Sequence, residues 1–162
     1  MSSINRRRFL SATASAAIAL AFVAARPVRV SAGRYQVEHT PEEWHKLLGD
    51  QRYAILREGG TEPAFSSALN AENRAGTYVC AGCALPLFSS KTKFDAGEGW
   101  PSFYDVLPHA VEFSNDYELV ELRTEVHCHR CGGHLGHRFN DGPPPTGLRY
   151  CIDGLALQFR RS

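Results

Sequence analysis

The chain of 162 residues carries 18 lysines and arginines against 17 aspartates and glutamates, which gives a formal net charge of +1. This length suits one domain with its own core. Because no charge of one sign dominates, electrostatics favours neither nucleic-acid binding nor attachment to a membrane surface, and we expect neither partner.

The first 32 residues differ in composition from the rest. The segment INRRRFL is followed by the charge-free apolar run 11–25 and then by small residues at 30–32. A run of this length is too short for a membrane-crossing helix, which needs roughly 20 residues, so the pattern predicts a cleaved signal peptide over residues 1–32. The paired arginines resemble the twin-arginine export pattern; an ordinary secretory signal or an uncleaved anchor is the alternative. We therefore expect a periplasmic mature domain over residues 33–162, without stable membrane association.

Two short helices are predicted at the start of this domain. Thr40-Pro41-Glu42-Glu43 combines a capping threonine, a proline at the first helical position and an acid at the third, which is typical of a helix N-terminus. A second helix should begin near Gln51 and end at Gly59-Gly60, because glycine readily takes the conformation that terminates helices.

Beyond these helices the helical period disappears. The segments rich in β-branched or aromatic residues, or alternating with period two, are GTYVC, ELVELRTEVHC, LRYCI and LALQF. In the longest of them, Val120, Leu122, Thr124 and Val126 alternate with Glu121, Arg123, Glu125 and His127. This alternation predicts one core face and one solvent face. The fold class is therefore mainly antiparallel β with short N-terminal helices.

Four of the five cysteines form two Cys-x-x-Cys pairs. Cys80 and Cys83 lie in YVCAGCALPLF, and Cys128 and Cys131 lie in VHCHRCGGHLG. Each pair follows a predicted strand and precedes small residues, so each resembles a knuckle, and two knuckles supply four thiolates for a tetrahedral zinc ion. Disulfides or separate roles are the alternatives, since export permits disulfides. We expect one structural Zn²⁺ and no organic cofactor.

The fifth cysteine, Cys151, lies on a predicted strand. The segment Asp141-Gly142-Pro143-Pro144-Pro145 cannot continue a strand, so we expect it to close a hairpin between the segment 137–139 and the strand around Cys151. Arg149 and Asp153 should then lie on the same face as Cys151, because side chains alternate along a strand.

This hairpin brings together groups that suit thiol chemistry. A guanidinium at Arg149 favours the nucleophilic thiolate, and an imidazole from His134 or His137 can move a proton. The two histidines are three residues apart, so both reach Cys151 only if Gly136 permits a bulge. A buried inert cysteine and structurally bonded histidines are the alternatives. Trp100, in GWPSF, is either a core aromatic or a surface for a methyl or thioether group.

The motifs YVCAGC, LFSSKTKFDAGEGWPSFYDV and ELRTEVHCHRCGGHLGHRFNDGPPPTGLRYCIDGLAL resemble, in order and over residues 36–160, the B-type peptide methionine-R-sulfoxide reductases. The resemblance implies a zinc-bearing β domain of two antiparallel sheets. It also implies an oxidoreductase that reduces the R epimer of methionine sulfoxide in proteins and peptides to methionine, as repair of oxidative damage. Oxidised proteins would then be the partners, and we expect a monomer.

The resemblance also implies roles for individual residues. Cys151 matches the nucleophile that becomes a sulfenic acid, Arg149 matches the arginine two positions before it, and His134 and His137 match the pair that places and protonates the substrate oxygen. Trp100 matches the tryptophan that packs on the methyl group of the substrate, and Thr61 resembles a threonine that lines the same pocket. We also expect Phe139 and Asp153 to contact the substrate. The zinc ligands are Cys80, Cys83, Cys128 and Cys131.

Two positions depart from the family pattern. Glu98 stands where many members carry a resolving cysteine, so an external thiol of thioredoxin type, or another exported thiol, should reduce the enzyme. Asp153 replaces the usual asparagine, and its carboxylate should raise the pKa of Cys151 unless a cation neutralises it. The rival interpretations are a zinc-ribbon-like protein-interaction module without catalysis and a disulfide oxidoreductase that uses the Cys-x-x-Cys pairs.

Overall fold

A computed structural model describes residues 34–116 and 123–162. The predicted signal peptide, residues 1–32, therefore lies outside the described residues. Among the helices of the described ranges, none combines the length and the apolar character that crossing a membrane requires.

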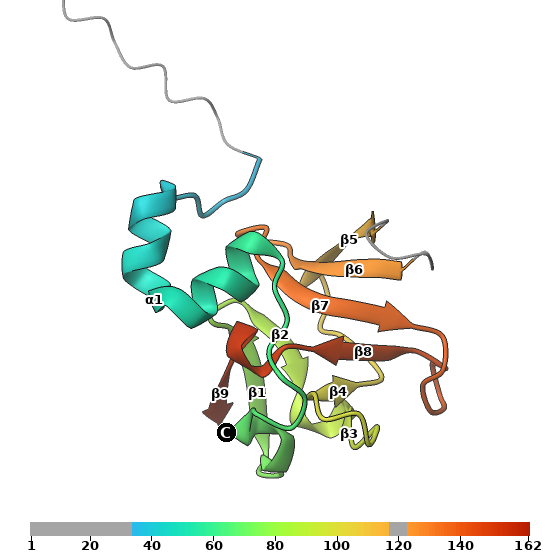
Figure 1. The fold of residues 1–162 in the computed structure, drawn as a ribbon. Coiled ribbons are helices and arrows are strands. Elements are labelled where there is room, and N and C mark those ends of the chain that lie inside the picture. Colours follow the sequence, from blue (N-terminus) through green and yellow to red (C-terminus); the bar gives the residue numbers. More distant parts are fainter. Residues whose placement is uncertain (1–33, 117–122) are drawn as a thin grey trace, which may run out of the picture. The chain divides into compact units, whose positions relative to one another are not determined.

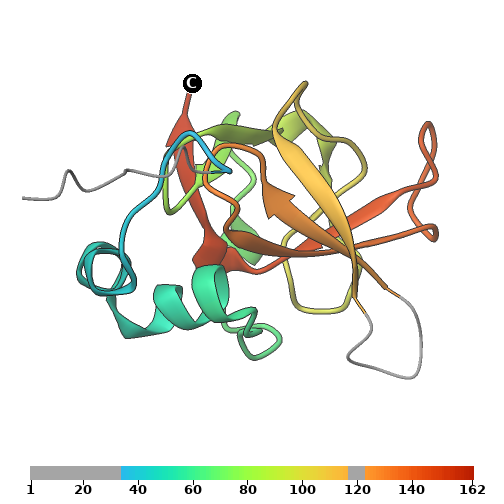
Figure 2. The same ribbon diagram turned by 90° about the horizontal axis from the view of Figure 1, so that it is seen from above.

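The helical region α1 (Pro41–Glu58) begins as its sequence predicts. The Glu43 backbone N–H donates to Thr40 Oγ1 at 3.2 Å, and the Thr40 N–H donates to Glu43 Oε2 at 2.9 Å, which completes a capping box. Gly49 has non-helical angles (φ 69°, ψ 169°), so α1 consists of two short helices, as predicted. Figure 2 shows the first half end-on and the second half from the side. The second half ends at Gly59, which has a left-handed conformation.

Two antiparallel sheets follow, as the resemblance implies (Figure 1). The smaller sheet has the order β2-β1-β9, and the larger has the order β3-β4-β8-β7-β6-β5. Their strands are β1 (Gly76–Cys80), β2 (Pro86–Ser89), β3 (Lys93–Phe94), β4 (Ser102–Phe103), β5 (Val111–Asp116), β6 (Arg123–Cys128), β7 (His134–Phe139), β8 (Arg149–Ile152) and β9 (Leu157–Arg161). Short 3-10 helices lie at Ala68–Ala71 (η1), Ser90–Thr92 (η2) and Gly154–Ala156 (η3).

The predicted solvent face of β6 is only partly exposed. Residues 117–122, which include three of the eight residues of the predicted alternation, lie outside the described residues. Val126 is fully buried, as expected for the core face. On the opposite face, however, the side chains of Glu125 and His127 are each only 22% exposed. The reason is that β7 brings His134 against them.

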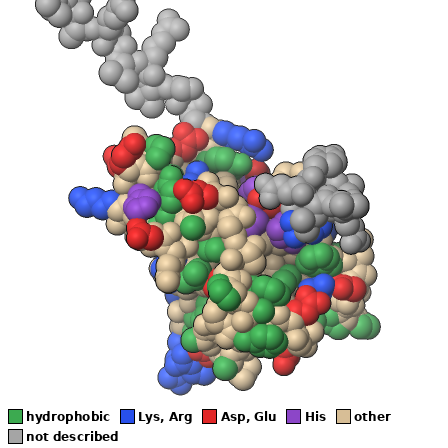
Figure 3. All heavy atoms as spheres, in the orientation of Figure 1, with side chains coloured by type: hydrophobic (Ala, Val, Ile, Leu, Met, Phe, Trp, Pro, Cys, Tyr) green, Lys and Arg blue, Asp and Glu red, His purple; other side chains and the backbone are tan. Residues whose placement is uncertain are grey.

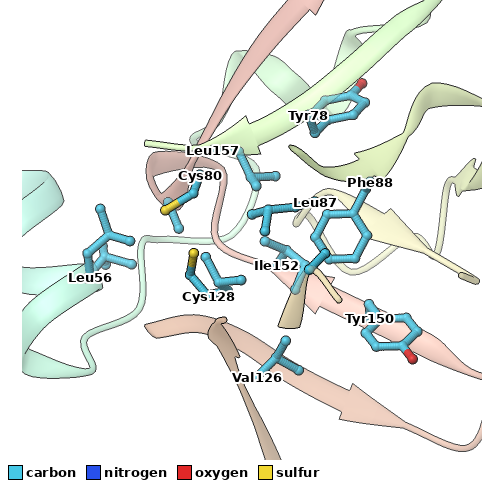
Figure 4. Close-up of a cluster of buried hydrophobic side chains, with 14 of the residues drawn as sticks. Leu56, Tyr78, Cys80, Leu87, Phe88, Val126, Cys128, Tyr150, Ile152 and Leu157 are labelled. Atoms are coloured by element: carbon cyan, nitrogen blue, oxygen red, sulfur yellow. The ribbon is translucent and has the colours of Figure 1, made fainter. Parts of the chain in front are cut away.

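The core lies where side chains from both sheets meet (Figure 4). Phe88 of β2 stacks on Phe103 of β4 with ring centroids 4.3 Å apart, and Tyr78 of β1 meets the edge of the same ring. From β8, Tyr150 and Ile152 are buried at 4% and 0% exposure. Each such side chain stabilises the fold by about 2 kcal/mol. The strand that carries Cys151 is thus anchored on both sides of that residue.

Candidate active site and metal centre

The two Cys-x-x-Cys pairs meet at one point, between the end of β1 and the end of β6. The four sulfur atoms all lie within 4.8 Å of one another. Cys80 Sγ is 3.7 Å from Cys131 Sγ, and Cys83 Sγ is 3.5 Å from Cys128 Sγ. Zn–S bonds of about 2.3 Å would place tetrahedral sulfurs about 3.8 Å apart. The four cysteines therefore fit a metal ion of this type, and Figure 4 shows the sulfur atoms of Cys80 and Cys128 pointing toward one another.

Both knuckles have the same backbone form. Four residues after the first cysteine, Ala84 and Gly132 have left-handed angles, with φ of 59° and 66°. Their N–H groups donate to the carbonyls of Cys80 and Cys128, each at 2.8 Å. In the first knuckle the Gly82 N–H also approaches Cys80 Sγ at 3.3 Å. Such turns aim two sulfurs at one point before any ion binds.

Cys151 lies away from this cluster, in an internal strand of the larger sheet. It is opposite His137 on β7 and opposite Ser102 on β4. The β7–β8 hairpin predicted from the proline segment is thus confirmed. Cys151 opens on a cavity of about 140 Å³. The cavity is lined by Thr61, Glu98, Trp100, Arg123, Gly136, His137, Phe139, Cys151 and Asp153.

Six of the eight residues that the sequence suggested for chemistry or substrate line this cavity. The other two, His134 and Arg149, are 5% exposed and stand behind its wall. Two further lining residues were not predicted from the sequence. Arg123 was not expected at the cavity, and Glu98 was noted only because it stands where many family members carry a resolving cysteine. Arg123 alternates with Glu125 and His127 along β6, and this pattern was the available signal.

The bulge that Gly136 was expected to permit is present; His137 lines the cavity and His134 stands behind its wall. The β6–β7 register shifts between Val126 and His127, so that Leu135 is an extra residue on β7. Gly136 has φ 144°, and a Cβ there would collide with the carbonyl oxygen of Cys151, so only glycine fits. The imidazoles of His134 and His137 consequently lie 5.5 Å apart, centroid to centroid.

His134 is oriented by a carboxylate. Its Nδ1 lies 2.5 Å from Glu125 Oε1, and its Nε2 lies 3.8 Å from Asp153 Oδ2. That Nε2 is buried and has no hydrogen-bond partner in the described part of the chain. Burial lowers the pKa of His134, while Glu125 acts in the opposite direction. The ring is therefore neutral at neutral pH, with the Nδ1 proton on the Glu125 side and a basic Nε2 on the Asp153 side.

Arg149 is held by two carboxylates. Its Nε and Nη2 donate to Asp141 at 2.9 and 2.8 Å, and its Nη1 donates to Glu98 at 2.5 Å. Its guanidinium also stacks over the Phe139 ring at 4.4 Å. Burial raises the pKa of Cys151 to about 11, Arg149 lowers it, and Glu98 and Asp153 raise it further. The predicted effect of Arg149 has the right direction, but burial outweighs it.

Asp153 is a buried carboxyl group, 3% exposed. Burial raises its pKa to about 7, which the hydrogen bond from the Glu62 N–H to its Oδ1, at 2.9 Å, only partly offsets. Glu62 is itself 3% exposed and accepts from the N–H groups of Gly154 and Leu155 at 2.6 and 3.0 Å. Its carbonyl accepts from the indole of Trp100 at 3.0 Å. Glu62, which the sequence did not reveal, thus ties together two cavity walls.

The site consists of a free thiol in a cavity with an imidazole and an indole, on a β domain whose other four cysteines form a separate cluster that fits a metal ion. The comparisons with known proteins are more specific. A family model described as the SelR domain matches residues 48–161. A peptide methionine sulfoxide reductase MsrB of Leptospira interrogans is 52% identical over 128 residues, which cover 78% of this chain and 98% of the relative.

Similar proteins also occur in other organisms. The MsrB proteins of Leifsonia xyli and Methanosarcina barkeri are each 50% identical, over 79% and 76% of this chain and 94% and 88% of their own lengths. The chain therefore belongs to the peptide methionine sulfoxide reductase MsrB family. A solved Mis18 'Yippee-like' domain has a TM-score of 0.43 and 16% identity, over 55% of this chain and 98% of that domain, and this likeness bears no weight.

Proposed function

We propose that the protein reduces the R epimer of methionine sulfoxide in proteins and peptides to methionine, with Cys151 as the nucleophile. One observation carries the proposal. Cys151 opens on a cavity with His137 and Trp100, while the other four cysteines are gathered at a separate point. Membership of the MsrB family supports the same reaction.

In the reaction, the sulfur of Cys151 attacks the sulfoxide sulfur, and the oxygen passes to the cysteine. The sulfoxide S–O bond breaks and a new S–O bond forms on Cys151, which becomes a sulfenic acid as methionine leaves. The cysteine sulfur is oxidised by two electrons and the methionine sulfur is reduced by two. Thiol and sulfoxide thus give sulfenic acid and thioether, without net uptake of protons.

The thiol proton is the one that the departing oxygen needs. Since the pKa of Cys151 is raised to about 11, the group is a thiol at neutral pH. His137, which lies opposite Cys151 across the β7–β8 pair, accepts this proton and delivers it to the sulfoxide oxygen. His134, oriented by Glu125, supports the charge that develops on this side of the cavity.

Selectivity for one epimer follows from two fixed walls. The Trp100 indole is held by its bond to the Glu62 carbonyl and presents an apolar face for the methyl group. The imidazoles offer a polar side for the oxygen. A site that fixes both the methyl group and the oxygen of the sulfoxide sulfur accepts the R epimer. The S epimer can place only one of these two groups correctly.

Regeneration requires a thiol from outside the chain. Four of the five cysteines belong to the metal centre, and Cys151 is the fifth. Two external thiols convert the sulfenic acid back to the thiol, releasing water and a disulfide. A thioredoxin-like protein or another exported thiol donor is the proposed reductant.

The metal centre has a structural role in this proposal. Cys80, Cys83, Cys128 and Cys131 would hold one Zn²⁺, which supplies folding energy by joining the ends of β1 and β6. We further propose that residues 1–32 direct export to the periplasm by the twin-arginine route and that the mature domain is a monomer. The support for export is the INRRRFL segment and the apolar run behind it.

The proposal is tested by assaying Cys151→Ser against both sulfoxide epimers of a methionyl peptide while zinc content is measured. The unmodified protein should reduce only the R epimer, and the variant should lose this activity with zinc and melting temperature unchanged. Turnover by the variant would remove Cys151 from the mechanism. If the unmodified protein reduces neither epimer with dithiothreitol as reductant, a zinc-ribbon-like interaction module becomes the better interpretation.

A further inference from the structure

A second hollow lies beside the cavity that holds Cys151. Its volume is about 560 Å³, roughly four times that of the smaller cavity. It is lined by Phe65, by the segment 70–73, by Ser90, by the segment 93–95 and by Gly99-Trp100-Pro101. Trp100 lines both spaces, so the two hollows adjoin at this residue.

Phe65 forms an aromatic wall of this hollow and faces water. With 72% of its surface exposed, it is the most exposed large hydrophobic residue in the described ranges. Its backbone has φ 64°, which costs a non-glycine residue about 1–2 kcal/mol. The Phe65 N–H donates to the Gly99 carbonyl at 2.8 Å, and a Cβ on Gly99 would lie 2.6 Å from the Phe65 nitrogen. The fold thus holds an apolar ring in water directly beside Trp100.

The floor of the hollow is also fixed by hydrogen bonds. Asn70 Nδ2 donates to the same Gly99 carbonyl at 2.8 Å. Lys93 Nζ donates to the Asn70 carbonyl at 2.8 Å and thereby connects the two lining segments. Figure 3 shows hydrophobic side chains gathered on this side of the molecule, over β3, β4 and the segment after α1. A hollow with such walls needs little reorganisation to accept a ligand.

We propose that this hollow binds the stretch of polypeptide next to the oxidised methionine, with an apolar or aromatic neighbour of that methionine packed on Phe65. The inference rests on the proposed function, since it takes the methionine sulfoxide side chain as the occupant of the small cavity. That cavity, at about 140 Å³, is below the roughly 300–1,000 Å³ of sites that enclose larger ligands. The second hollow lies within this range and adjoins the small cavity at Trp100.

In this proposal, Phe65 causes the protein to bind polypeptide more tightly than the free amino acid. A free methionine sulfoxide fills only the small cavity and does not reach Phe65. A peptide reaches both, and burial of the exposed ring against its neighbouring side chain adds affinity. Removing the ring should therefore weaken peptide binding selectively.

Binding is measured by calorimetry on the full chain with the Cys151→Ser substitution, which prevents turnover. The ligands are a heptapeptide with a central methionine-R-sulfoxide flanked by phenylalanine, and N-acetylmethionine-R-sulfoxide amide. Phe65→Ala should raise the peptide Kd about 5- to 10-fold and change the ratio of the two Kd values by the same factor. The matched control is Leu47→Ala, because Leu47 is similarly exposed, at 62%, but lies on α1. It should leave both Kd values unchanged.

Three results would overturn the inference: an unchanged peptide Kd in Phe65→Ala, an equal change in Leu47→Ala, or no peptide binding at all. Since turnover plays no part in this measurement, failure of the proposed function appears separately. It would be seen as the absence of R-epimer reduction by the unmodified protein, whatever the Kd values are.

Discussion

The two places where cysteine occurs differ in how their sulfur atoms are surrounded. At the metal centre, four sulfurs lie within 4.8 Å of one another, and three of the four residues are buried. Cys151 is not part of this cluster in the described residues, and it is instead close to Arg149, Glu98 and Asp153. The same side chain thus serves two purposes. Thiolates that face each other repel, so they need a cation to be stable. The pKa of a single thiol depends instead on the charged groups around it.

The charges around Cys151 do not favour the thiolate. The positive charge of Arg149 is shared between Asp141 and Glu98, and the buried Asp153, which lines the cavity, lies close to the buried Glu62. Glu98 and Asp153 both raise the pKa of Cys151, against the lowering by Arg149. In the proposed reaction, the thiol proton therefore moves as the sulfur attacks, and the histidines act as proton carriers.

The largest expected effect separates the two sites by stability. Cys128→Ser removes one of four ligands and leaves three thiolates without a complete shell. We expect loss of zinc and unfolding, since a structural zinc site contributes about 10 kcal/mol or more to folding. Cys151→Ser should keep both zinc and melting temperature. Metal analysis and thermal unfolding of both variants measure this contrast, and a stable, zinc-free Cys128→Ser protein would contradict it.

A smaller effect is expected where a carboxylate orients His134. Glu125→Gln replaces the charged acceptor of the His134 Nδ1 proton by a neutral one, so the ring holds positive charge less well. We expect kcat to fall by about 10-fold with KM little changed. Ser114→Ala is the matched control, because Ser114 Oγ donates to the other oxygen of Glu125 at 3.2 Å and contacts His127. Equal losses in both variants would mean that Glu125 acts only on stability.

The smallest effect concerns pH. The Asp153 carboxyl has a pKa of about 7 in the folded protein, above its ordinary value of 3.8. Between these values the folded chain retains a proton that the unfolded chain has lost, so the wild-type protein loses stability as pH rises from about 4 to 7. Asp153→Asn can keep the bond from the Glu62 N–H without this titration. The melting temperature of Asp153→Asn minus that of the wild type should therefore increase from pH 4 to pH 8. A difference that stays constant over this range would contradict the prediction.

The same substitution should also change the thiol. An ionised Asp153 raises the pKa of Cys151, so the asparagine variant should be alkylated by iodoacetamide with a midpoint about half a unit lower in pH. An unchanged midpoint would show that Asp153 remains neutral over the pH range in which Cys151 ionises.

Much of this arrangement could be predicted because its signals are local. The knuckles, the capping box at Thr40, the proline hairpin and the bulge at Gly136 each depend on a few neighbouring residues whose conformational preferences are strong. These predictions agree with the described structure. The resemblance to a known family added the two-sheet fold and the residues of the cavity.

The remainder could not be predicted because it depends on contacts between distant segments. The two-residue strands β3 and β4 are too short to show any periodicity. Glu62 meets Asp153 across 91 positions of sequence, and Glu98 meets Arg149 across 51. An isolated glutamate carries no sign that its partner is a buried carboxyl or a shared arginine. Only the packing of the sheets brings these groups together and determines their proton affinities.

The central claim is that Cys151 alone receives the oxygen of the substrate. It is tested most directly by a single turnover of the zinc-loaded protein with a methionine-R-sulfoxide peptide, without reductant and with dimedone present to trap a sulfenic acid. Peptide mapping by mass spectrometry should find one methionine formed per chain and one dimedone adduct, on Cys151. An adduct on Cys80, Cys83, Cys128 or Cys131, or methionine formed without modification of Cys151, would contradict the account.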